Sequence, residues 1–277
     1  MSAIIGLTGS YILSRYLADS NDGIKMVLMF YGLVNLGVGL ATIFFMEDDR
    51  PAGQAEFSGR LTDLRRVAAN PDIWLIAAII FSAYFSFRIQ DIMTPYSTNV
   101  CGLSAALGAT VASIRTYVMG GGAVLGGLAG DRLGPANTMI IGFMTIILTN
   151  LIFLLIPGNP ATLAIFLSAL MPFMVAHFMM RGVYYALLTE GRVPLETTGL
   201  ATGIIATVAY TPDVFSPLYQ GFFLDHFGRA EQAGYTYIFL SSLLSCLAGL
   251  FFCYLFKRRL GKANRQAPAP LTAKLQP

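Results

Sequence analysis

Charged residues are scarce in this sequence. They make up 12% of its 277 residues, whereas an ordinary soluble domain carries about 25%. The charges are also unevenly placed, because long segments have almost none and the short segments between them hold most of them. So little charge is hard to reconcile with a water-facing surface, and it favours a protein whose surface lies in lipid.

Histidine, cysteine and catalytic motifs are scarce as well. The sequence has only two histidines, which argues against a multi-histidine metal site. Its three cysteines show no C-x-x-C spacing, and we interpret them as free cysteines on apolar faces: Cys101, Cys246 and Cys253. A G-x-S-x-G, an H-E-x-x-H and a Walker loop are also absent. We therefore expect no metal, no cofactor, no nucleic-acid partner and no enzymatic activity.

Long apolar segments are what the sequence has instead. They lie at 3–18, 26–46, 73–97, 104–129, 137–157, 160–189, 197–224 and 233–256. A transmembrane helix needs about 20 predominantly apolar residues, and most of these segments reach that length. The sequence therefore predicts an all-α integral membrane protein, a helical bundle with about eight transmembrane helices in the lipid bilayer.

Basic residues predict how these helices are oriented. Most of them fall in the segment 47–72, in the loops near Arg132 and Arg192, and in the tail after residue 256. The opposite side receives only Arg15, Lys25 and Arg229. Because cytoplasmic loops are enriched in Lys and Arg, we expect a multi-pass protein of the cell membrane, a bacterial inner membrane, with its C-terminus in the cytoplasm.

Two polar segments interrupt or follow the apolar ones. Within 47–72, the stretch FSGRLTDLRRVA places Phe57, Leu61 and Leu64 on one helical face and basic residues on the other. This pattern predicts a helix that lies along the membrane surface, although a solvated connector has the same pattern. The segment 261–277 is rich in Pro and Gln and is predicted to be disordered.

A short turn motif occurs twice between apolar segments. The first copy lies in GGLAGDRLGPANTM, at 126–139, and the second in GFFLDHFGRAEQ, at 221–232. Glycines before the first copy would let another helix approach closely, and a carboxylate such as Asp131 is favoured near the N-terminus of a neighbouring helix. We interpret both copies as conformational latches, formed by Gly127, Asp131, Arg132 and Gly134 and by Gly221, Asp225 and Gly228.

The first copy resembles the signature cytoplasmic loop of the major facilitator superfamily (MFS), G-x-x-x-D-R-x-G. Members of this family usually continue with a basic residue, where this sequence has Pro135. The family has twelve helices in two six-helix bundles, and the resemblance is to helices five through twelve. It implies that 1–46 holds the last two helices of an N-terminal bundle, 47–72 the cytoplasmic linker and 73–260 a six-helix C-terminal bundle. We therefore expect either a fragment of a twelve-helix protein or a short product.

Ionisable residues inside the predicted spans are the candidates for solute binding or coupling, because each costs about 2.5 kcal/mol or more at the bilayer centre. They are Arg88, Asp91, Arg115, His177, Arg181 and Asp213. Aromatic residues near them, including Tyr84 and Phe87, either surround a solute or simply pack helices.

Several roles stay open for these charges. Arg88 and Asp91 are three residues apart and could neutralise each other on one helix. Arg115 has no partner on its own helix, and His177 is either a hydrogen-bonded interior residue or a proton carrier. Asp213 follows one helix-breaking proline and precedes another, as in the broken helices of transporter sites.

The excess of interior arginine over aspartate favours an anionic partner, because Arg holds carboxylate or phosphate through paired hydrogen bonds. The leading hypothesis is a secondary transporter of a small solute, an organic anion or a sugar-like metabolite, that works by alternating access. Coupling to H⁺, as in a symporter, could pass through Asp91, Asp213 or His177. The alternative is a truncated, non-transporting remnant or a receptor-like membrane scaffold.

Overall fold

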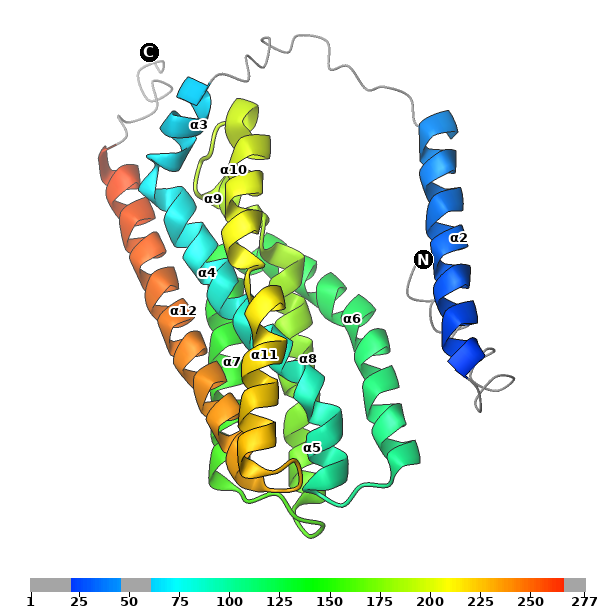
Figure 1. Ribbon diagram of the computed structural model, residues 1–277. Helices are drawn as coiled ribbons and strands as arrows, with labels where there is room; N and C mark the ends of the chain where they lie inside the picture. Colours follow the sequence, from blue (N-terminus) through cyan, green and yellow to red (C-terminus); the bar gives the residue numbers. More distant parts are fainter. Residues whose placement is uncertain (1–20, 46–60, 267–277) are drawn as a thin grey trace, which may run out of the picture. The chain divides into compact units, whose positions relative to one another are not determined.

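The computed structural model describes residues 21–45 and 61–266, and this described part contains helices and no strand (Figure 1). The chain divides into two units, Met1–Ser58 and Gly59–Pro277. In the first unit the described element is helix α2, Asn21–Phe45, which corresponds to the predicted segment 26–46. The predicted segment 3–18 lies outside the described residues.

The second unit holds the other described helices. These are α3 Leu61–Ala68, α4 Pro71–Arg88, the short 3₁₀ helix η1 Ile89–Ile92, α5 Met93–Asn99, α6 Ala105–Leu133, α7 Pro135–Leu155, α8 Leu163–Val183, α9 Ala186–Glu190, α10 Leu195–Ala209, α11 Pro212–Phe227 and α12 Gln232–Gln266. Local residues set where several of them begin. The Asn70 side chain accepts a hydrogen bond from the main-chain N–H of Asp72, which caps α4. Helices α7 and α11 begin with proline, the residue that fits a first helical position.

Within residues 21–45 and 61–266, four helical stretches are long and apolar enough to cross a membrane by length and composition: Pro71–Asn99, Pro135–Leu155, Leu163–Val183 and Gln232–Lys262. The remaining predicted segments from 26–46 onward are also helical, but each differs for a visible reason. The apolar part of α2, Met29–Thr42, is short. Helix α6 has the required length, but its glycines and Arg115 make it less apolar. The segment 197–224 is divided into α10 and α11, and each is too short to span the bilayer alone.

Packing in the second unit follows a definite order: α6 lies against α8, α8 against α7, α7 against α12, α12 against α4, and α4 against α10. The contact between α6 and α8 depends on glycine, as the sequence predicted. A side chain at Gly122, Gly126 or Gly130 would meet α8, and one at Gly182 would meet the main chain of α6. These residues let the two helix backbones approach closely.

Two polar segments can be compared with their predictions. The amphipathic helix expected within 47–72 is present as α3, with Arg65 and Arg66 exposed and Val67 buried. Phe57 lies outside the described residues. The disorder predicted from residue 261 is wrong for 261–266, because α12 continues to Gln266. That stretch, GKANRQ, contains Lys, Ala, Arg and Gln, which are good helix formers and extend a helix that is already nucleated. Residues 267–277 lie outside the described part.

Candidate functional site

Two interruptions of the helices bring charged residues together in the second unit. Helix α4 ends at Arg88, and the chain passes through η1, which carries Asp91, before α5 begins. Helix α10 ends at Ala209 and α11 restarts at Pro212, so that Asp213 lies in the first turn of α11. A carboxylate is favoured in the first turn of a helix. The break predicted at Pro212 is therefore present, whereas Pro217 lies inside α11 and does not end it.

Ion pairs join these residues across four elements. The Arg88 Nη2 lies 3.0 Å from Asp91 Oδ2, and its Nε lies 3.2 Å from Asp213 Oδ1. The Arg115 Nη1 on α6 donates to Asp91 Oδ1 at 2.9 Å. The pair of Arg88 and Asp91 was predicted, whereas Arg115 finds its partner on a different helix. We call Arg88, Asp91, Arg115, Arg181 and Asp213 the charge cluster.

Aromatic side chains complete the charge cluster. The Tyr84 hydroxyl donates to Asp213 and lies 2.9 Å from each carboxylate oxygen. The guanidinium of Arg181, on α8, lies 4.6 Å from the ring centre of Phe87 and 5.8 Å from that of Tyr84. Arg181 forms no ion pair with the acidic residues that the structure describes. Its charge is therefore held by aromatic faces and is not neutralised by a carboxylate.

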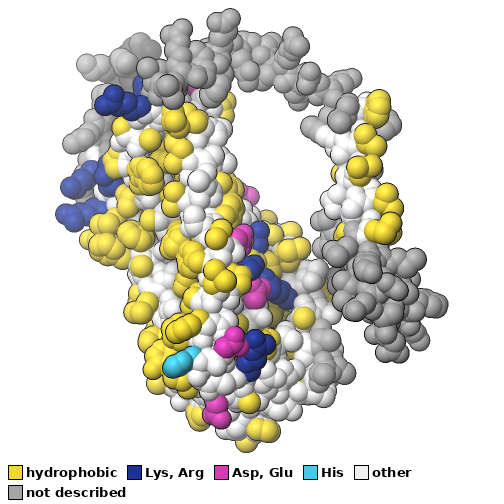
Figure 2. Space-filling view, viewed as in Figure 1, with side chains coloured by type: hydrophobic (Ala, Val, Ile, Leu, Met, Phe, Trp, Pro, Cys, Tyr) yellow, Lys and Arg dark blue, Asp and Glu magenta, His cyan; other side chains and the backbone are white. Residues whose placement is uncertain are grey.

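The side chains of the charge cluster are partly exposed. The side chains of Arg88 and Arg115 are 23% and 27% exposed, and those of Asp91 and Asp213 are 34% and 49% exposed. Figure 2 shows acidic and basic side chains side by side in the middle of the visible face of the molecule. Because these side chains are partly exposed, a polar solute could contact them without displacing the apolar core.

His177 lies apart from the charge cluster in a buried hydrogen-bond chain. Its Nδ1 is 2.8 Å from the carbonyl oxygen of Phe173, and its Nε2 is 3.0 Å from Ser86 Oγ. Ser86 Oγ is in turn 2.7 Å from Ser242 Oγ, which accepts from Asn150 Nδ2. A carbonyl can only accept, so Nδ1 carries the hydrogen. If Ser242 donates to Ser86, and Ser86 to Nε2, every hydroxyl hydrogen in the chain has an acceptor and the imidazole is neutral.

At the first turn motif, the carboxylate that caps the following helix, α7, is not that of Asp131, which the sequence suggested. Gly134 has φ of +87° and ends α6, a conformation that favours glycine. The carboxylate at the N-terminus of α7 is that of Glu190, whose Oε2 accepts from the Ala136 N–H at 2.7 Å. Asp131 and Arg132 are exposed and form no ion pair within the described part of the chain. From the sequence, Glu190 was interpreted as an interfacial loop residue that could belong to a gate. Its contact with this turn was not predicted, because Glu190 lies 54 positions beyond Ala136 in the chain.

The second turn motif ends α11 in the same way. Gly228 has φ of +92°, and Asp225 pairs with Arg229 at 2.9 Å on the exposed surface. A Cβ at Gly221 would meet nothing within 4 Å, and the same is true of Gly127. The two motifs therefore share a left-handed glycine at a helix end, while their first glycines face open space.

Comparison with known proteins identifies the family. The sequence profile of the Major Facilitator Superfamily matches residues 1–217. The chain belongs to the major facilitator superfamily. This membership agrees with the expected fold, an all-α integral membrane protein of the MFS type.

Relatives and solved structures agree with this assignment. The chain is 25% identical over 275 residues to the inner membrane protein YqcE of Escherichia coli strain K12, covering 95% of this chain and 63% of YqcE. It is 24% identical over 254 residues to the inner membrane protein YihN of the same organism, covering 88% of this chain and 59% of YihN. In structure it is similar to a bacterial homologue of the human lysosomal transporter Spinster in an inward-facing, occupied conformation. That similarity has a TM-score of 0.58 and 17% identity, and it covers 96% of this chain and 65% of the homologue. The chain thus spans about three fifths of the length of these relatives.

Proposed function

We propose that this MFS chain contributes a six-helix bundle, at 73–260, to a secondary transporter that moves a small anionic solute by alternating access. The observation that carries the proposal is the charge cluster at the helix breaks. Charged side chains are costly at membrane depth and are typical there of solute and ion pathways. Membership of a family of transporters supports transport in preference to catalysis.

The charge balance supports an anion as the solute. In the charge cluster three arginines face two aspartates, and the ion pairs use both carboxylates on Arg88 and Arg115. Arg181 is left as a positive charge over two aromatic rings. A solute carboxylate or phosphate would supply the missing negative charge, and the planar guanidinium can hold it through two parallel hydrogen bonds.

Proton coupling would follow from competition for Arg88. A solute anion that bound Arg88 would displace Asp213, which Arg88 contacts at 3.2 Å. The displaced carboxylate would then face the solute with a like charge, and a proton on Asp213 would remove that repulsion. His177 is not part of this scheme, because its hydrogen bonds within the buried chain favour a structural role.

The close packing of α6 and α8 supports movement of the bundle as a rigid body. Glycines on both helices bring their main chains into direct contact, and such interfaces resist internal sliding. Alternating access would then occur at the turn motifs and between bundles. We also propose that the C-terminus is cytoplasmic, as the basic residues favour, and that the protein lies in a bacterial inner membrane, as the names of its relatives suggest.

Uptake by cells that produce the chain tests the proposal. Labelled lactate, succinate and glucose 6-phosphate serve as anionic probes, and glucose as a neutral one. We expect saturable uptake of at least one anion, which Arg181→Gln and Arg115→Ala abolish while membrane insertion stays normal. Arg65→Gln is the matched control, because Arg65 is exposed on α3 and lies outside both the charge cluster and the turn motifs.

The same experiment separates the alternatives. Uptake of glucose that exceeds uptake of the anions would favour the sugar-like solute. Insertion without uptake of any probe would favour the non-transporting remnant or scaffold. Normal anion uptake by both cluster variants would show that the charge cluster is not the solute site.

A further inference from the structure

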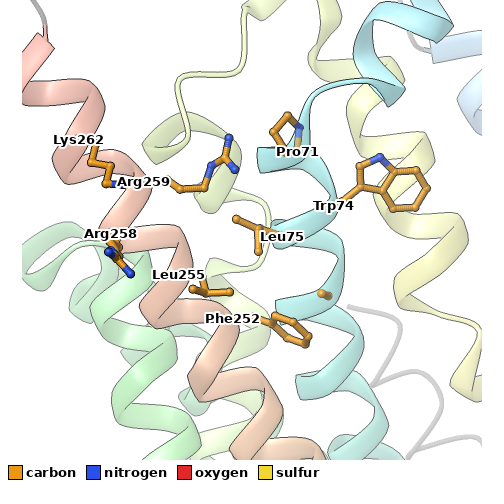
Figure 3. A pocket seen from close by; sticks show the side chains of 9 residues that line it. Pro71, Trp74, Leu75, Phe252, Leu255, Arg258, Arg259 and Lys262 are labelled. Atoms are coloured by element: carbon orange, nitrogen blue, oxygen red, sulfur yellow. The ribbon is translucent and has the colours of Figure 1, made fainter.

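A cavity outside the charge cluster lies where α4 and α12 run side by side, near the basic end of α12. A cavity of about 550 Å³ opens between the two helices. Its floor is apolar and includes Leu75 and Ala78 from α4 and Phe252 and Leu255 from α12. Figure 3 shows Leu75, Leu255 and Phe252 between the two helices, with Lys262 and Arg259 above them and Arg258 at the left, on the other side of α12. We call this cavity the α4–α12 groove.

Three basic side chains line one end of the groove, and they differ in whether they form an ion pair. Arg259 Nε forms an ion pair of 2.7 Å with Asp72 Oδ1, which ties α12 to the start of α4. Arg258 and Lys262 also line the groove, and they form no ion pair with the acidic residues that the structure describes. This end of the groove therefore has a net positive charge that the described protein does not neutralise.

The basic end continues an apolar stripe along α12. Leu240, Leu244, Leu247 and Phe251 are exposed, and they follow one another at intervals of three or four residues, which places them on one helical face. Continuing with the same spacing from Phe251 leads to Leu255, then to Arg258 and then to Lys262. One face of α12 thus changes from hydrocarbon side chains to cations within two turns.

Trp74 marks the same change on α4. Its side chain lines the groove and the residue is 47% exposed, and its indole N–H donates to the main-chain oxygen of Ala68 at 2.7 Å. Tryptophan is enriched at the boundary between the hydrocarbon core and the headgroups, where its ring is apolar and its N–H is bonded. If α4 and α12 cross the bilayer, as their length and composition allow, the groove lies at the level where a phospholipid changes from acyl chain to phosphate.

We propose that the α4–α12 groove binds one anionic phospholipid molecule. Its phosphate would lie between Arg258 and Lys262, and one acyl chain would run along Phe252 and Leu255 toward the apolar stripe. The basic side chains favour an anionic headgroup over a neutral one, because basic pockets between transmembrane helices bind anionic lipid headgroups. The apolar floor favours a lipid over a free anion, because an acyl chain would cover this apolar surface and inorganic phosphate would leave it exposed.

Native mass spectrometry of the purified chain in detergent tests this proposal. Phosphatidylglycerol, phosphatidylcholine with the same acyl chains, and inorganic phosphate are titrated separately. We expect a single saturable phosphatidylglycerol adduct, with at least tenfold weaker binding of phosphatidylcholine and no retained phosphate. Arg258→Gln/Lys262→Gln should weaken phosphatidylglycerol binding about tenfold or more, and Arg258→Lys/Lys262→Arg should restore it.

A matched control removes the same charge elsewhere. Arg65 and Arg66 are exposed on α3 and lie outside the groove. The variant Arg65→Gln/Arg66→Gln should therefore bind phosphatidylglycerol as the wild type does. Ala78→Phe fills the apolar floor and should weaken binding while every cation remains. Equal binding of phosphatidylcholine, equal binding of inorganic phosphate, or equal losses in the groove and control variants would each overturn the proposal. Circular dichroism confirms that each variant is folded.

Discussion

Replacement of neighbouring glycines on α6 provides a test of how α6 and α8 pack. Gly126 and Gly127 lie in the same helix, but a Cβ at Gly126 would overlap the main-chain carbonyl of Met179 on α8. A Cβ at Gly127 would meet nothing within 4 Å. In both positions alanine raises helix propensity by about 1 kcal/mol relative to glycine, so this contribution is the same in the two variants and cancels in their difference.

The packing contribution does not cancel. The atoms of Met179 that the new Cβ would overlap belong to the main chain, so they cannot rotate away as a side chain would. The overlap can be removed only if α6 and α8 move apart. Overpacking of this kind costs about 1–3 kcal/mol. We expect Gly127→Ala to raise the free energy of unfolding by about 1 kcal/mol, and Gly126→Ala to have a free energy of unfolding about 1–3 kcal/mol below that of Gly127→Ala.

Equilibrium unfolding in mixed detergent micelles measures both values. Increasing the fraction of sodium dodecyl sulfate unfolds the chain, and far-ultraviolet circular dichroism follows the loss of helix. Equal stabilities for Gly126→Ala and Gly127→Ala would refute the close approach of α6 and α8. Gly127 belongs to the turn motif and Gly126 does not, so a transport defect in Gly127→Ala without a loss of stability would instead support the latch.

Three further substitutions test separate contacts by the same assay. Glu190→Ala removes the side chain that caps α7 and should lower the free energy of unfolding by about 0.5–2 kcal/mol; an unchanged value would contradict the cap. Ser86→Ala breaks the buried chain to His177 and should cost about 1–3 kcal/mol; a loss below 0.5 kcal/mol, on the order of a surface change, would argue against that chain. Asp72→Asn removes the partly exposed pair with Arg259 and should cost only about 0–1 kcal/mol; a larger loss would indicate a more buried pair.

Local sequence signals predicted the positions of the helices and the break in the seventh apolar segment. Both signals are local. The length of an apolar segment can be read from that segment alone, and Pro212 breaks its own helix because it fixes φ and lacks an N–H. Arg88 and Asp91 could be paired from sequence because residues three apart meet on a helix. The glycines of α6 likewise indicated a close approach, although the sequence did not say which helix would approach.

Contacts between different helices could not be predicted from these local sequence signals. Arg115 pairs with Asp91 from a different helix, and Glu190 caps a helix that begins far earlier in the chain. Such contacts depend on which helices lie side by side, and one sequence carries no local pattern for that. The 3₁₀ turn at Ile89–Ile92 was also missed, although Pro95 follows it and has no N–H to donate to the carbonyl oxygen of Asp91.

The roles of the charge cluster in binding and coupling remain the account's central proposal. The most direct measurement is the thermal unfolding midpoint of the purified chain against increasing concentrations of succinate, glucose 6-phosphate and glucose. A solute that binds only the folded protein raises this midpoint with concentration. We predict a rise for at least one anion and none for glucose. Loss of one charged hydrogen-bonding group is worth about 1.5–3 kcal/mol. Arg181→Gln should therefore need roughly tenfold to a hundredfold more of that anion to reach the same midpoint, and the control Arg65→Gln should not. The same midpoint shift in wild type and Arg181→Gln would contradict the account.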